Sequence, residues 1–111
     1  MRENADRRQV WQQDYAALGR VRDRRTDRAR EAALATYGLT WEDEIRVVAE
    51  QGGGCGVCGD LPDRAYDIDH DHVTGAFRGF LCGRCNKGLG LLGDSIEGLR
   101  KALLYLERAQ Q

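Results

Sequence analysis

A long hydrophobic run is missing from this 111-residue sequence, whose longest unbroken apolar stretch is Ala102–Leu106. A helix that crosses a bilayer needs roughly 20 predominantly apolar residues. The opening residues, Met1–Arg8, also lack the apolar segment that a secretory signal carries. The sequence therefore predicts neither membrane insertion nor export, and we expect the protein to act in the cytoplasm.

Apolar residues make up only 41% of the chain. One domain of this size buries a modest core, so a structural metal would be a useful supplement. The segment Gly88–Gly93 formally fits the glycine pattern of dinucleotide-binding folds, but the βαβ context that this pattern requires is absent. We therefore expect no organic cofactor.

Positive charge is concentrated near the start of a chain whose net charge is −1. Residues 2–30 contain nine arginines against five acidic residues, a local balance of +4. This stretch contains no proline, and its apolar residues recur at helical spacing, so residues 1–36 are predicted to form an Arg-rich helical segment. Because arginine matches phosphate oxygens, the segment is either a DNA-contacting arm or a solvated helix face. The candidate contacts are Arg24, Arg25 and Arg28.

The four cysteines form two pairs, Cys55 with Cys58 and Cys82 with Cys85, each with C-x2-C spacing. Thiolates from two such pairs suit the tetrahedral geometry of a closed zinc site, in which the metal is structural. Two disulfides are the alternative, which the absence of an export signal disfavours. The sequence predicts a structural Zn2+ held by all four cysteines.

Local signals divide the residues after position 36 into short elements. Gly38 predicts a helix end, and Thr40 with Asp43 resembles a capping box that opens a helix to about Glu50. Alternating residues over 65–69 and 76–81, with a turn signal at Thr74-Gly75 between them, predict a β-hairpin. This hairpin lies between the two cysteine pairs.

Two helices are expected after the hairpin. One begins at Asn86, directly after the last cysteine, and the other begins at Asp94-Ser95 and continues to about Gln110. The fold class is therefore α+β, mostly helical, with a small zinc-stabilised core. The last helix presents one apolar face, either core or the seam of a homodimer, made by Ile96, Leu99, Leu103 and Leu106.

Both histidines lie in one tetrad, Asp69-His70-Asp71-His72, between the cysteine pairs. A strand, a turn, a second strand and a helix would bring Asp69, His70 and Asn86 around one point. Carboxylate and amide oxygens are ligands that Mg2+ accepts, and an imidazole can deprotonate an attacking water. The trio predicts phosphodiester hydrolysis with Mg2+ or Mn2+. The alternative roles for the tetrad are capping of backbone groups by the histidines, or a third metal-ligand pair of a degenerate zinc module.

Further motifs accompany the tetrad: Tyr37-Gly38-Leu39-Thr40, Gln51-Gly52-Gly53, Thr74-Gly75, Arg78-Gly79 and Cys85-Asn86. Together with the cysteine pairs they resemble the recombination endonuclease VII family, within the HNH or His-Me finger nucleases that share a ββα-metal core. The resemblance covers roughly residues 37–106. It implies a zinc-stabilised nuclease domain over residues 37–111 that acts on DNA.

The resemblance also implies roles for individual residues. Asp69 and Asn86 would be ligands of the catalytic metal, His70 the general base, and His72 an auxiliary group near the phosphate. One family feature is missing, because the acidic residue expected three positions after the asparagine is Leu89 here.

Three basic residues near the tetrad, Arg78, Arg84 and Lys87, are candidates for phosphate contacts. The rival function is a zinc-stabilised DNA-binding module without hydrolytic activity, accessory to packaging or recombination. The leucine at position 89 and the Arg-rich start favour that rival. A nuclease acting on RNA is a third option, since nothing in the motif tests for a 2′-hydroxyl. The resemblance points to a phage or prophage setting.

Overall fold

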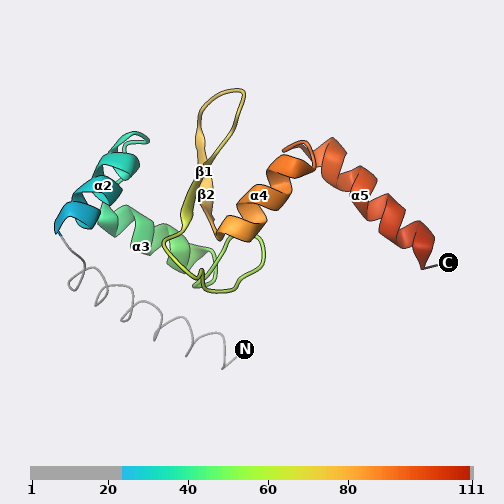
Figure 1. Ribbon diagram of the computed structural model, residues 1–111, viewed down its shortest axis with the longest axis horizontal. Coiled ribbons are helices and arrows are strands. Elements are labelled where there is room, and N and C mark those ends of the chain that lie inside the picture. Colours follow the sequence, from blue (N-terminus) through green and yellow to red (C-terminus); the bar gives the residue numbers. More distant parts are fainter. Residues whose placement is uncertain (1–23, 111) are drawn as a thin grey trace.

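The computed structural model describes residues 24–110, and within this range it contains four helices and one two-stranded sheet. Figure 1 shows the hairpin between the α2–α3 pair and α4, with α5 extending away from the rest. The α+β class expected from the sequence is confirmed. No helix in this range is long and apolar enough to cross a membrane. The elements are α2 (Arg24–Ala35), α3 (Trp41–Glu50), β1 (Asp67–His70), β2 (Phe77–Leu81), α4 (Gly83–Leu91) and α5 (Ile96–Ala109).

The turn between α2 and α3 follows the local signals of the sequence. Gly38 has a φ of 71°, a left-handed conformation that glycine adopts without a steric penalty and that commonly ends a helix. The Thr40 side chain accepts a hydrogen bond from the Asp43 backbone N–H, and the Asp43 carboxylate accepts one from the Thr40 N–H. The predicted capping box is therefore confirmed. The helices expected before residue 24 lie outside the described residues, and the division at residue 36 stays a prediction.

The main core lies where α2 and α3 meet the hairpin. Its buried members come from α2, α3, the segment before β1, and β2: Leu34, Val48, Tyr66 and Phe80. Trp41 and Ile45 of α3 pack against this cluster. The core is small, and it fixes the hairpin against the helices on one side only.

One charged residue enters this core. Glu44 is fully buried, and Arg30 of α2 forms an ion pair with it through both carboxylate oxygens, each at 2.9 Å. Burial raises the pKa of Glu44, and the adjacent guanidinium opposes that effect by favouring the charged carboxylate. The Arg30 guanidinium also lies 5.9 Å from the centre of the Phe80 ring. The pair therefore joins α2 to α3 beside β2.

Replacing Arg30 by alanine is expected to lower the free energy of unfolding by about 3–5 kcal/mol, because Glu44 would remain buried without its partner. Urea denaturation followed by circular dichroism measures this change. Arg28→Ala is the matched control, since Arg28 lies on the same helix but is exposed and should change stability by less than about 0.5 kcal/mol. Equal stability of the two variants would contradict a structural role for the pair.

The hairpin pairs β1 with β2 in antiparallel register, with Ile68 opposite Phe80 and Asp69 opposite Gly79. The register shifts between Asp69 and His70, and such an irregularity re-aims side chains at the end of a strand. The Asp71 carboxylate accepts hydrogen bonds from two backbone N–H groups of the turn that follows. The predicted hairpin is confirmed, although β1 is displaced toward the turn and includes His70.

Helix α4 begins earlier than predicted. Its first residue is Gly83 rather than Asn86, because Cys82 acts as the N-cap and its sulfur accepts a hydrogen bond from the Cys85 N–H. Asn86 consequently lies inside the helix, near its first turn. The start of α5 agrees with the prediction, since the Ser95 hydroxyl caps it by accepting from the Gly98 N–H.

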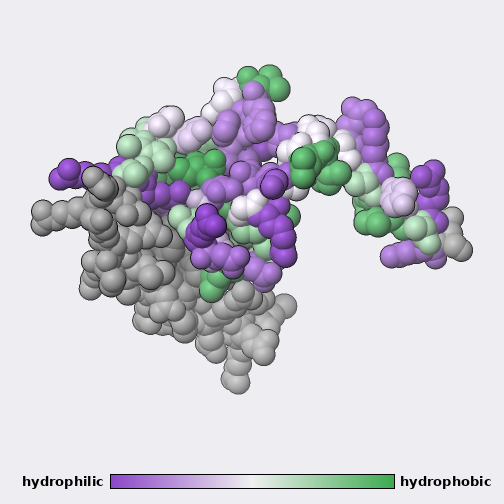
Figure 2. All heavy atoms as spheres, viewed as in Figure 1, coloured by the Kyte–Doolittle hydropathy of each residue, from purple (hydrophilic) through white to green (hydrophobic). Residues whose placement is uncertain are grey.

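The apolar face of α5 is not part of the core. Ile96 is 76% exposed and Leu103 is 56% exposed. Figure 2 shows hydrophobic residues at the α4–α5 corner and along α5 on the visible surface. Of the two roles that the sequence left open for this face, only the dimer seam stays a prediction.

Candidate functional site

The four cysteines form one compact cluster. Their sulfur atoms all lie within 4.8 Å of one another, and the Cys58 and Cys82 sulfurs are 3.9 Å apart. A zinc–sulfur bond of about 2.3 Å places the sulfurs of a tetrahedral site about 3.8 Å apart. None of the four forms a disulfide. The cluster therefore fits a structural metal and is consistent with zinc, as predicted.

Backbone N–H groups point at the sulfurs of this cluster. The Val57 N–H donates to Cys55 and the Asp60 N–H donates to Cys58, each at 3.4 Å. Burial acts to raise the pKa of the Cys55 thiol, but backbone hydrogen bonds outweigh it and lower that pKa to about 6. Burial raises the pKa of Cys85 in the same cluster to about 12, so the four thiols do not ionise alike. The thiolate is the form that binds a metal.

Two features of the first cysteine loop hold the cluster against the hairpin. A Cβ at Gly54 would clash with the carbonyl of Gly59, so the loop closes only with glycine there. Gln51 exchanges two hydrogen bonds with the backbone of Phe80, and its amide also donates to the Gly54 carbonyl. Gln51 therefore joins the loop to β2.

His70 lies at the end of β1 beside Tyr37. The Tyr37 hydroxyl is 3.2 Å from Nδ1 of His70, and the two rings stack with their centres 5.6 Å apart. The centre of the His72 ring is 5.2 Å from the centre of the His70 ring. Tyr37 belongs to the turn after α2, and no local signal in the sequence indicated that it would contact the predicted base.

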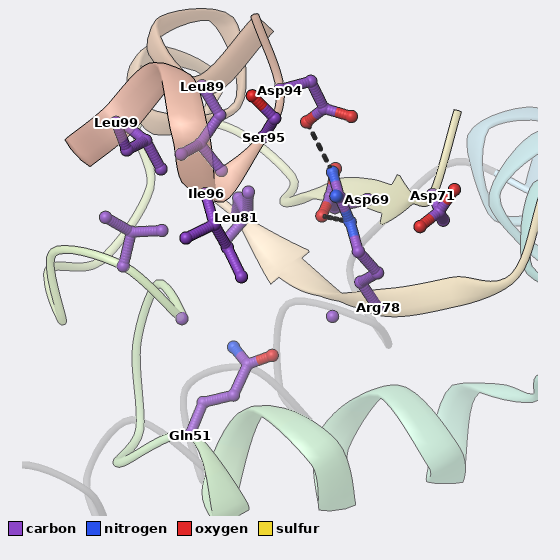
Figure 3. A pocket seen from close by; sticks show the side chains of 13 residues that line it. Gln51, Asp69, Asp71, Arg78, Leu81, Leu89, Asp94, Ser95, Ile96 and Leu99 are labelled. Carbon is purple, nitrogen blue, oxygen red and sulfur yellow. Dashed lines mark hydrogen bonds and ion pairs between the residues drawn. The ribbon is translucent and has the colours of Figure 1, made fainter. Parts of the chain in front are cut away.

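Asp69 is buried, and its carboxylate forms an ion pair with Arg78. The guanidinium donates to both carboxylate oxygens, at 2.7 and 2.9 Å, and donates again to Asp94 at 2.7 Å (Figure 3). The hydrogen bond from Arg78 lowers the pKa of Asp94. Arg78 therefore connects the hairpin to the residue that precedes the cap of α5, and sequence analysis did not predict this link.

Asn86 contacts a different carboxylate. Its side-chain nitrogen donates to Asp67 at 3.1 Å, which connects the first part of α4 to the first residue of β1. The predicted trio is thus divided among three partners: Tyr37 for His70, Arg78 for Asp69 and Asp67 for Asn86. Within residues 24–110, the four cysteines are the only group of three or more histidine, cysteine or acidic ligands close enough to share a metal ion.

The remaining predicted site residues lie around this region. His72 is exposed, and its Nδ1 lies 3.8 Å from the Asp94 carboxylate. Arg84 and Lys87 are exposed on α4, and a hydrogen bond to the Cys58 sulfur raises the pKa of Arg84. Arg28 is exposed on α2. The side chains of Arg24 and Arg25 lie outside the described part of the structure.

A cleft of about 600 Å3 lies beside the Arg78 network. Figure 3 shows Asp69, Arg78 and Asp94 at one end of it, and apolar side chains of β2, α4 and α5 at the other. The cleft therefore connects the charged network to the apolar face of α5 through Leu89, Ile96 and Leu99.

Comparison with known proteins is consistent with this arrangement. Residues 30–108 match the family model described as recombination endonuclease VII. The chain is 44% identical over 78 residues to the Gene 59 protein of Mycobacterium phage D29, covering 68% of this chain and 47% of the relative. It is 42% identical over 76 residues to the Gene 59 protein of Mycobacterium phage L5, covering 66% and 46%. The chain thus matches about half the length of these relatives, and no solved structure matches it.

Proposed function

Because the chain belongs to the recombination endonuclease VII family, we propose that it is a metal-dependent DNA endonuclease of the HNH type that hydrolyses phosphodiester bonds. The observation that carries this proposal is the position of His70, which ends β1 of a hairpin followed at once by α4. The ββα-metal core predicted from the sequence needs a histidine at the end of its first strand and an asparagine on the helix that follows its second strand.

In this proposal His70 is the general base. The Tyr37 hydroxyl lies at Nδ1, and Nε2 has no hydrogen-bond partner among residues 24–110, so it is the nitrogen available to a water molecule. The stacked Tyr37 ring restricts the rotation of the imidazole. His72 is exposed and lies beside His70, and it is the proposed auxiliary group near the phosphate.

Asp69 and Asn86 are the proposed ligands of a catalytic Mg2+ or Mn2+, distinct from the structural zinc. Such a metal would stabilise negative charge on the phosphate and the departing oxygen. Both oxygens of Asp69 accept hydrogen bonds from Arg78, so this guanidinium would repel a cation bound to Asp69 unless Arg78 moved away. A DNA phosphate is a suitable new partner for the released arm of Arg78.

Exposed basic side chains around the hairpin and on α2 and α4 would bind the DNA backbone. Arg28, Arg78, Arg84 and Lys87 are proposed as phosphate contacts, together with Arg24 and Arg25. We propose that this activity takes place in the cytoplasm of an infected host, because both relatives are phage proteins. A second copy of the chain, packed along the exposed apolar face of α5, would supply a second active site. Light scattering tests that dimer by comparing the mass of the wild type in solution with that of Leu103→Glu.

A supercoiled plasmid assay tests the proposed function. The zinc-loaded protein is expected to convert supercoiled DNA to nicked or linear forms in Mg2+ or Mn2+, and to leave it intact in buffer without either ion. Gel-shift measurements on the same plasmid report binding separately. Binding without strand loss at high protein concentration would instead support the DNA-binding module without hydrolytic activity, and cleavage of RNA but not DNA would change the substrate class.

A further inference from the structure

The residue that contacts Asn86 is Asp67, the first residue of β1. Its Oδ2 accepts the hydrogen bond from Nδ2 of Asn86 at 3.1 Å. The same oxygen lies 3.8 Å from where a Cβ would stand at Gly83, the first residue of α4. Asp67 therefore lies at the junction between β1 and the start of α4, which are adjacent in Figure 1.

The hydrogen bond fixes which end of the Asn86 amide is available. An asparagine amide rotates broadly about its last bond, and only its oxygen can coordinate a hard cation. With Nδ2 held by Asp67, Oδ1 points to the other side, and no hydrogen bond to Oδ1 occurs within residues 24–110. The contact thus selects the orientation in which the oxygen is free.

Asp69, the other aspartate of β1, does not make this contact with Asn86. Both of its oxygens are engaged by Arg78, and Arg78 is held in turn by Asp94. Asp67 is half-buried, and among the described residues its carboxylate has no hydrogen-bond or ion-pair partner other than the Asn86 amide. The two aspartates of β1 therefore have different partners.

We propose that Asp67 is a positioning residue for the catalytic metal site: it holds the amide nitrogen of Asn86 so that the amide oxygen faces the cation. This inference rests on the proposed function. Groups that orient a metal ligand in this way typically change metal affinity by about 10- to 100-fold when they are removed.

The test is Mn2+ binding to the zinc-loaded protein, measured by electron paramagnetic resonance. Asp67→Ala is expected to weaken Mn2+ binding about 10- to 100-fold. Asp67→Asn keeps an oxygen that can accept from Nδ2 of Asn86, so it should restore binding to within about threefold of wild type. Asp63→Ala removes the same charge from an exposed position in the preceding loop and should bind Mn2+ as wild type does. Zinc content and the thermal midpoint of each variant report whether it is folded.

The outcomes separate the inference from the function on which it rests. Wild-type nicking together with unchanged Mn2+ binding by Asp67→Ala would overturn the role of Asp67 alone. Equal loss in Asp67→Asn and Asp67→Ala would also overturn it, because the negative charge rather than the hydrogen bond would then matter. A wild-type protein that neither binds Mn2+ nor cuts DNA or RNA would overturn the proposed function and this inference with it. If the inference holds, Asp67→Ala will weaken binding no further in an Asn86→Ala background.

Discussion

Alanine in place of His70 is expected to slow plasmid nicking by about 100- to 10,000-fold, the contribution that a positioned general base makes to a proton transfer. DNA binding should change little, because the candidate phosphate contacts are arginine and lysine side chains elsewhere on the surface. Single-turnover cleavage with saturating protein measures the chemical step, and a gel shift measures binding. His70 is half-buried beside Tyr37 rather than in the main core, so the variant should keep its fold and its zinc.

His72→Ala is the matched control for this experiment. It also removes an imidazole, two residues further along the chain. The His72 side chain is 60% exposed, and its Nδ1 lies 3.8 Å from the Asp94 carboxylate. Its effect on the cleavage rate should be much smaller than that of His70→Ala. If His70→Ala nicked DNA at the wild-type rate while His72→Ala did not, the assignment of the base would move to His72. If neither changed the rate, the tetrad would not be the catalytic centre.

The features that the sequence predicted correctly are those set by near neighbours in the chain. The capping box at Thr40, the glycine turn at Gly38 and the serine cap at Ser95 each depend on residues within a few positions. The cysteine cluster is a longer-range feature, but the spacing within each pair fixes two sulfurs locally. The tetrahedral geometry of a zinc site then predicts that the two pairs come together. These sequence patterns predict structure well because each of them is compatible with few alternative local structures.

The features that the sequence did not predict are pairings of side chains across elements. Asp69 with Arg78 and Asn86 with Asp67 depend on the strand register and on the shift between Asp69 and His70. Alternation along β1 leaves Asp67 and Asp69 equivalent by pattern, so nothing in the sequence separates their partners. The structure separates them.

Two other differences have simple physical causes. Glu44 is one of three acidic residues in the first turn of α3, where negative charge is favourable, yet unlike a surface carboxylate it is buried and paired with Arg30 from another helix. Helix α4 begins at Gly83 because a cysteine sulfur serves as its cap, a role usually taken by oxygen-bearing side chains. The same sulfur belongs to the metal cluster, so the helix start and the metal site form together.

Removal of zinc is expected to unfold the protein. The cluster at the cysteines has only three buried residues, Cys55, Leu81 and Cys82, so little apolar packing would remain there without a metal. Structural zinc contributes an apparent binding free energy on the order of 10 kcal/mol, comparable to the whole stability of a small domain, about 5–15 kcal/mol. Treatment with a strong zinc chelator should therefore abolish the cooperative thermal transition seen by circular dichroism.

Cys58→Ser should have the same effect as chelation, while Val57→Ser, an exposed change at the neighbouring position, should keep both zinc and the transition. Readdition of ions separates the two metals. Zinc should restore the fold, whereas Mg2+ alone should restore neither fold nor nicking, because α4 starts at the cluster and carries Asn86. A chelated protein that melted at the wild-type midpoint would show that packing alone holds the hairpin to α4, and the site would then need no structural metal.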